Sequence, residues 1–154
     1  MSLPTTLGRP VIAFGRAMDW LSPLFDLAVR LWVAHAFFQS GLSKIQSWDS
    51  TLMLFEYEYD VPLLSPDIAA YLGTAAELGL PVFVALGLLG RLSSLALFLF
   101  NIVAVYSYAS FLLGEHGAAG LGQHILWGFM LLMVVFHGPG KLSLDHLIQK
   151  WMGR

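Results

Sequence analysis

Several side chains that can carry charge or bind a ligand lie inside long apolar stretches of the chain. They are Arg30, His35, Gln39, Lys44, Glu77, Asn101 and His124. An ionisable group in hydrocarbon is costly unless it has a polar partner or faces a water-filled cavity. These residues are therefore the candidates for a functional site. Their types suit ion pairing, hydrogen bonding to a polar head group, or proton transfer.

Four of these residues are expected at similar depth. A helical rise of about 1.5 Å per residue places Arg30 about 9 Å and His35 about 16 Å from the inner edge of the first apolar stretch. The same rise places Glu77 about 14 Å from the opposite edge, with Asn101 at a comparable level. The spacing predicts a central polar layer, in which Arg30 reaches up to form a buried ion pair with Glu77.

The other three residues predict a second polar layer nearer the outer surface. Gln39 and His124 come out at similar depth on the first and fourth apolar stretches, with Lys44 just above them. If the two stretches are neighbours in a bundle, these side chains line one cavity. Lys44 would supply positive charge there, and His124 a group that titrates near neutral pH.

Three interpretations of the polar set remain open. It could fix the register of the helices through an ion pair and interhelical hydrogen bonds. It could line a small cavity for a ligand, a quinone head group or a metal ion, or it could conduct protons or ions. A metal site is not expected, because the chain has no cysteine and no pair of histidines at local metal-binding spacing.

The elements that must position these residues are membrane-spanning helices. The composition is 57% hydrophobic and only 12% charged, whereas soluble domains carry about 25% charged residues. Apolar windows long enough to cross a bilayer are those at 24–43, 68–89, 92–113 and 120–137. We therefore predict one all-α domain over residues 1–154, a membrane four-helix bundle in contact with the lipid bilayer.

The basic residues predict the orientation of this bundle. Six of the eight fall at one end of the four-span model, and they are Arg9, Arg16, Arg91, Lys141, Lys150 and Arg154. Positive residues favour the cytoplasmic side, so both termini are expected there. The long acidic loop over 44–67 then faces outward. No basic patch or arm is present, and nucleic-acid binding is not expected.

Three further segments flank the spans. Apolar residues share one side of 11–21, and Ser143 can cap a short helix over 144–151, so both ends are expected to form interfacial helices. The outer loop contains the alternating run Tyr57, Glu58 and Tyr59. This run predicts an extended segment or an amphipathic cover, which would act as an aromatic belt, a lid or a docking surface for a basic partner.

The motifs resemble those of the DoxX family of small four-span bacterial membrane proteins. The resemblance covers about Val29 to Asp145. Its pieces are Gly41-Leu42-Ser43-Lys44, Glu77-Leu78-Gly79, Gly87-Leu88-Leu89-Gly90-Arg91, His124 and Gly138-Pro139-Gly140-Lys141-Leu142-Ser143-Leu144-Asp145. The run from Phe55 to Leu64 resembles one subgroup of the family.

The resemblance implies a multi-pass protein of the bacterial inner membrane. The family takes its name from the small subunit of a thiosulfate:quinone oxidoreductase, so we expect an accessory redox subunit that engages a quinone or a small periplasmic substrate. The alternatives are a binding or assembly module for a metal- or oxidative-stress system, and a small transporter. Expected partners are further copies of the chain or other membrane or periplasmic proteins. No catalytic residue carries over from the family.

Overall fold

The computed structural model describes residues 5–153, and these residues form helices joined by short connections. The helices are α1 (Thr5–Gln46), α2 (Trp48–Tyr57), α3 (Pro66–Leu86), α4 (Gly90–Ser107), α5 (Ala109–Leu112), α6 (Ala118–His137) and α7 (Leu144–Trp151). Four of them, α1, α3, α4 and α6, are long and apolar enough to cross a membrane. The predicted all-α membrane bundle is confirmed.

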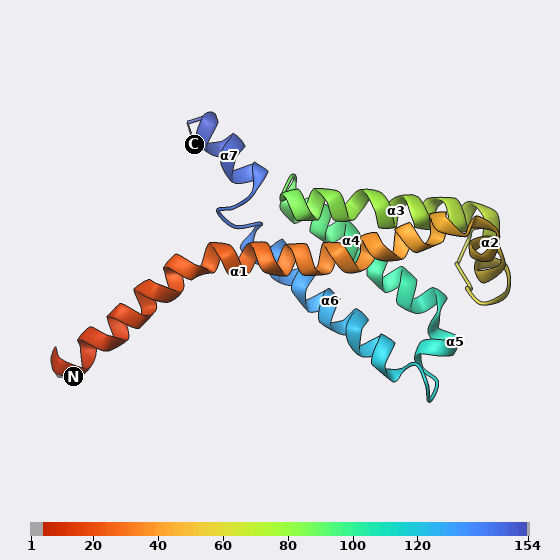
Figure 1. Cartoon of the computed structure of the whole chain (residues 1–154), viewed down its shortest axis with the longest axis horizontal. Coiled ribbons are helices and arrows are strands. Elements are labelled where there is room, and N and C mark those ends of the chain that lie inside the picture. The colour runs from red at the N-terminus through yellow and green to blue at the C-terminus, as the bar shows by residue number, and fades with distance from the viewer. Residues whose placement is uncertain (1–4, 154) are drawn as a thin grey trace.

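The four long helices form a closed ring. Each packs on two others, in the order α1, α3, α4, α6 and back to α1. Figure 1 shows α1 and α3 lying side by side, with α4 and α6 crossing beneath them. The centre of the ring is filled by large apolar side chains, namely Val33, Phe37, Val84, Leu97 and Leu131. The first and fourth spans are therefore neighbours, as expected for short-looped antiparallel hairpins.

Helix α1 is longer than the span expected from the sequence. It runs for 42 residues and contains Pro10 and Pro23. Proline removes one helical hydrogen bond, and Figure 1 shows α1 bending as its N-terminal part leaves the bundle. The segment 11–21 is thus continuous with the first span, and its position at the membrane interface stays a prediction.

The long outer loop contains a helix rather than an extended segment. Helix α2 packs on α3, where Phe55 forms a small buried cluster with Ala69 and Ala70. Thr51 Oγ1 donates to the backbone oxygen of Lys44 at 2.9 Å, which ties α2 to the end of α1. At the end of the third span, α4 stops at Ser107 and the short α5 follows.

The glycine-rich motif after α6 joins three helix ends. Asp145 accepts hydrogen bonds from the backbone N–H groups of Leu89 at 2.8 Å and Gly90 at 2.7 Å, and so caps α4. Gly87 has a φ of 62° and faces Ser143 so closely that an added Cβ would lie 2.5 Å from it. Ser143 accepts from the backbone N–H of His146 at 3.2 Å, which confirms it as the cap of α7.

Candidate functional site

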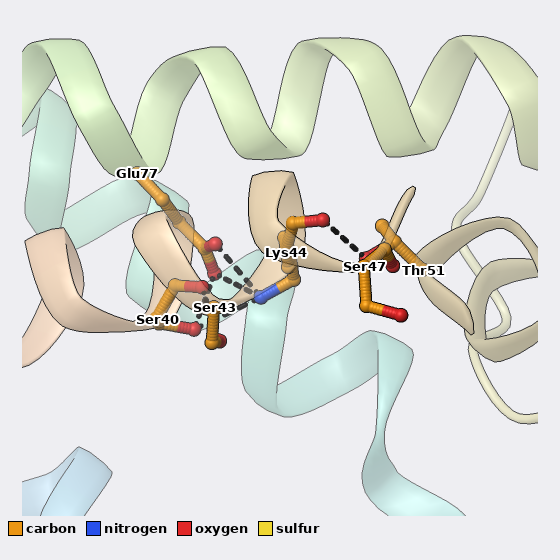
Figure 2. Close-up of polar contacts among 6 residues, drawn as sticks. All are labelled: Ser40, Ser43, Lys44, Ser47, Thr51 and Glu77. Atoms are coloured by element: carbon orange, nitrogen blue, oxygen red, sulfur yellow. Dashed lines mark hydrogen bonds and ion pairs between the residues drawn. The ribbon is translucent and has the colours of Figure 1, made fainter. Parts of the chain in front are cut away.

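A buried ion pair joins α1 to α3. Lys44 Nζ lies 2.7 Å from Glu77 Oε2 and 2.9 Å from Oε1, and it also donates to Ser40 Oγ at 2.9 Å. The Ser40 hydroxyl donates to Glu77 Oε1 at 3.2 Å, which closes the network (Figure 2). Both Lys44 and Glu77 are buried. A charged pair at such depth persists because each group neutralises the other.

Local geometry explains why these three residues meet. Helical side chains lean toward the N-terminus, so Lys44 reaches back one turn to Ser40. The helices approach closely at Gly41, where an added Cβ would lie 2.9 Å from the side chain of Leu78 and 3.0 Å from Cβ of Glu77. A larger residue at position 41 would therefore push the α1 and α3 backbones apart and separate Lys44 from Glu77.

The predicted pair between Arg30 and Glu77 is wrong. Arg30 is fully buried, but its guanidinium donates to the backbone oxygens of Val84 at 3.2 Å and Ala85 at 2.6 Å, and also to that of Leu142. Its side chain leans toward the N-terminus of α1, away from Glu77, for the same reason that Lys44 reaches back. Arg30 thus stabilises the free carbonyls at the C-terminal end of α3 and holds the glycine-rich motif against it.

A second polar pair joins α4 to α6. Asn101 Nδ2 donates to the backbone oxygen of His124 at 3.0 Å, and Asn101 Oδ1 lies 2.7 Å from His124 Nδ1. The His124 ring packs edge-on against Trp127, with ring centroids 5.0 Å apart. Asn101 is buried and therefore fixes the position of the His124 ring.

A cavity of about 350 Å³ lies between these two polar pairs. Its wall includes Ser40, Lys44 and Glu77 on one side and His124 on another, with Ser107 and mainly apolar or aromatic side chains between them. The apolar part is formed by Phe55, Val61, Leu64, Ala69, Leu72, Ala76, Phe100, Val103 and Ala104. Such a lining, apolar with a few fixed polar groups, is typical of small-molecule sites.

Aromatic residues from the outer loop and from the end of α4 cover the cavity. Tyr59 packs edge-on against Phe55 and Tyr108, with ring centroids 4.9 and 4.8 Å apart. The Tyr108 hydroxyl donates to Glu58 Oε2 at 3.1 Å, and the backbone N–H of Asp60 donates to the oxygen of Ser107 at 2.9 Å. Burial, and secondly the negative charge of Glu77, raise the pKa of Tyr59 to about 12. The Tyr59 phenol is therefore neutral at physiological pH.

The predicted loop residues face in different directions. Tyr57 is 76% exposed, Glu58 contacts Tyr108, and Tyr59 lines the cavity.

The structure separates the other predicted site residues into two groups. Lys44, Glu77 and His124 line the cavity, and Asn101 supports it from behind. His35 and Gln39 are exposed on α1, and His35 lies in a separate apolar surface groove with Leu31, Phe38 and Pro81. The prediction that they share the polar layers of the bundle is corrected, because they lie on the outer side of α1.

Sequence reasoning missed Ser40, Ser107 and Tyr108. Ser40 lies one helical turn before Lys44, and that spacing was the available signal. Ser107 and Tyr108 end α4, which was expected to continue past them. Within residues 5–153, no group of three or more histidine, aspartate or glutamate side chains is arranged to hold a metal ion.

The comparisons with known proteins agree with this architecture. The family model described as DoxX matches residues 25–110. An uncharacterised protein of Haemophilus influenzae is 32% identical over 126 residues, which cover 80% of this chain and 83% of that protein. No solved structure matches the chain. With four apolar spanning helices and a family match over more than half its length, the chain belongs to the DoxX family and is a multi-pass bacterial inner-membrane protein.

Proposed function

We propose that the cavity binds the ring of a quinone or a similar small aromatic molecule, and that the protein serves as an accessory subunit of a membrane redox system. The single observation that carries this proposal is the composition of the cavity wall. Aromatic and aliphatic side chains form most of it, and a neutralised polar network of Ser40, Lys44 and Glu77 lies at one side. A quinone matches this wall, because it has a flat apolar ring and polar oxygen atoms at the edge of the ring.

The size and surroundings of the cavity suit such a ligand. Ligand pockets commonly enclose about 300–1,000 Å³, and this one encloses about 350 Å³. It is formed largely by membrane-spanning helices, so it lies close to the bilayer in which a quinone dissolves. The lysine and glutamate neutralise each other, which favours an uncharged ligand over an anion or a cation.

The basic residues support an opening toward the periplasm. Arg16, Arg91 and Lys141 lie at one end of the bundle, and Lys44 with the acidic α2 segment lies at the other. Arg154, which belongs to the same basic set in the sequence, lies outside the described residues. With the basic end in the cytoplasm, the covered mouth of the cavity faces outward. Tyr59 and Phe55 then form a lid over the site.

A pair of adjacent substitutions tests the proposal. Ala76 lines the cavity, whereas Ala75 is its exposed neighbour on α3. In lipid nanodiscs, the wild type and Ala75→Phe should bind a short-chain quinone saturably, and Ala76→Phe should lose about tenfold or more in affinity, because the added ring occupies the cavity. Equal affinity in all three proteins, or no saturable binding by the wild type, would refute the proposal.

A second candidate function is a docking module for a basic partner. Tyr57 is exposed beside Glu56 and Glu58, and Leu63 is fully exposed with a φ of 67°, a conformation that a leucine rarely adopts. These residues form an acidic and apolar outer tip. Co-purification that is lost in Tyr57→Ala and Leu63→Ser, with quinone binding absent from the wild type, would favour this function over the first.

A further inference from the structure

The hydrogen-bond donors of the ion-pair network are all used within the protein. Lys44 carries three N–H donors, and it has three acceptors within 2.9 Å, namely both carboxylate oxygens of Glu77 and Ser40 Oγ. The Ser40 hydroxyl donates its proton to Glu77 Oε1. A ligand in the cavity therefore finds no free donor on Lys44 or Ser40.

The same network retains an unused acceptor. An ionised carboxylate offers about four lone-pair positions, and Glu77 accepts from Lys44 twice and from Ser40 once. One position on Glu77 is left for a donor from outside the protein. The side of the cavity that carries the positive charge thus acts toward a ligand as a hydrogen-bond acceptor.

His124, which lines the cavity from α6, carries a second acceptor. The Asn101 amide is oriented by the backbone oxygen of His124, which can only accept, so Nδ2 faces that oxygen and Oδ1 faces His124 Nδ1. Nδ1 must then carry the proton, and Nε2 of the neutral ring is an acceptor. None of the described residues donates to Nε2.

Ser107 and Tyr59 add hydroxyl groups to the polar lining, and Tyr108, which also lines the cavity, donates its hydroxyl to Glu58. Ser107 Oγ is buried in the cavity wall and has no hydrogen-bond partner among the described residues. The Tyr59 phenol also lines the cavity. A ligand hydroxyl can accept a hydrogen bond from Tyr59 or Ser107 and still donate to Glu77 or His124, whereas a carbonyl oxygen can only accept.

From these free acceptors and hydroxyl groups in the cavity wall we infer that the cavity selects a ligand with aromatic hydroxyl groups. The hydroquinone form of a quinone then binds more tightly than the quinone form. The inference rests on the proposed function and adds the redox state of the ligand. A quinone in the same place would leave the acceptors of Glu77 and His124 without donors in a largely apolar site. Burying such groups unpaired weakens binding more than the loss of one ordinary hydrogen bond.

Three matched probes separate the hydroxyl effect from ring size. They are decylubiquinone, decylubiquinol and the dimethyl ether of that quinol, titrated under anaerobic conditions into the full-length protein in lipid nanodiscs. The quinol should bind about tenfold or more tightly than the quinone. The dimethyl ether should bind no better than the quinone, because it keeps the ring and loses both donors.

Variants identify the acceptors. His124→Phe keeps an aromatic ring and removes Nε2, so it should reduce the preference for the quinol several-fold. Quinol binding loses an acceptor, and the quinone no longer meets an unpaired one. His35→Phe is the matched control, because His35 is exposed outside the cavity, and it should keep the full preference. If His124→Phe does not fold, His124→Leu serves as the second variant, because it removes the same acceptor, and it should also reduce the preference.

Each remaining outcome overturns the inference. Equal affinity for quinol and quinone, tighter binding of the quinone, or a dimethyl ether that binds like the quinol would each contradict selection by hydroxyl donors, while leaving the quinone site in place. A preference that is unchanged in a folded His124→Phe or His124→Leu protein would also contradict it. Absence of binding by all three probes would overturn the proposed function as well.

Discussion

Lys44 Nζ lies 2.7 Å from Glu77 Oε2, and this contact joins the end of the first spanning helix to the middle of the second. Both residues are buried, and removing one partner leaves the other charge uncompensated. The pair therefore contributes to holding α1 against α3, and its polar atoms form one side of the cavity.

The first prediction concerns this pair. Glu77→Ala should lower the free energy of unfolding by on the order of 3–5 kcal/mol, because Lys44 is left buried and unpaired. Lys44→Met combined with Glu77→Leu should recover most of that loss. The measurement is denaturant unfolding in mixed micelles, with Arg30→Ala combined with Glu77→Ala as the control. Rescue by the Arg30 change instead would show that Arg30 is the true partner.

The second prediction concerns Arg30. Its guanidinium donates to backbone oxygens of Val84, Ala85 and Leu142 at once, which needs the planar fork that lysine lacks. Arg30→Lys should therefore lower the unfolding free energy by about 1–3 kcal/mol, since buried carbonyls lose their donors. Hydrogen exchange should show faster opening near Gly140 and Leu142, with the ligand cavity unaffected. Unchanged exchange in that segment would contradict this role.

The third prediction is the orientation. In the sequence, six of the eight basic residues fall on one side of the four-span pattern, so both termini should be cytoplasmic. A reporter active only in the cytoplasm should be active when fused at Arg154 and inactive when inserted within 50–54. A periplasmic reporter should give the reverse. A periplasmic C-terminus would contradict the orientation and place the lid on the cytoplasmic side.

The fourth prediction concerns alkaline pH. Tyr59 has a pKa raised from 10.0 to about 12, so the folded state favours the neutral phenol. Its contribution to stability is complete below the unfolded pKa of 10.0 and is lost as the pH rises through about 12. Tyrosinate absorbance should contain a late step that shrinks by one tyrosine in Tyr59→Phe and that Tyr57→Phe, at an exposed position, leaves in place. A late step of unchanged size in Tyr59→Phe would contradict this.

Much of the fold could be predicted from the sequence because long apolar windows and basic end residues are strong signals. The four spans, their ring order and the Ser143 cap follow from length, loop size and residue type. The partners inside the bundle were harder to predict. Depth along the helix places Arg30 near Glu77. Helical side chains point toward the helix N-terminus, however, so the Arg30 side chain extends away from Glu77 and the Lys44 side chain extends toward it.

The faces of the helices were also hard to predict. Polarity and depth along the helix assign His35 and Gln39 to the interior, yet the close approach at Gly41 turns another face of α1 toward α3. Which face is buried depends on the small residues at helix contacts, and these leave only a weak pattern in a chain that is apolar throughout. The sequence predicts that a cavity with polar groups exists. It does not predict which residues line that cavity, because the lining depends on where α4 ends and on how α2 packs.

Photo-crosslinking tests the central claim, that the cavity holds an aromatic redox molecule, most directly. Membranes containing the protein are irradiated with an azido-quinone, and the labelled peptides are mapped by mass spectrometry. The account predicts labels on cavity-lining residues of α3 and the lid, such as Leu72, Gly73 and Tyr59, which excess quinone suppresses and Ala76→Phe abolishes. Labels confined to lipid-facing positions such as Phe129 and Phe136, equal in the wild type and Ala76→Phe, would contradict it.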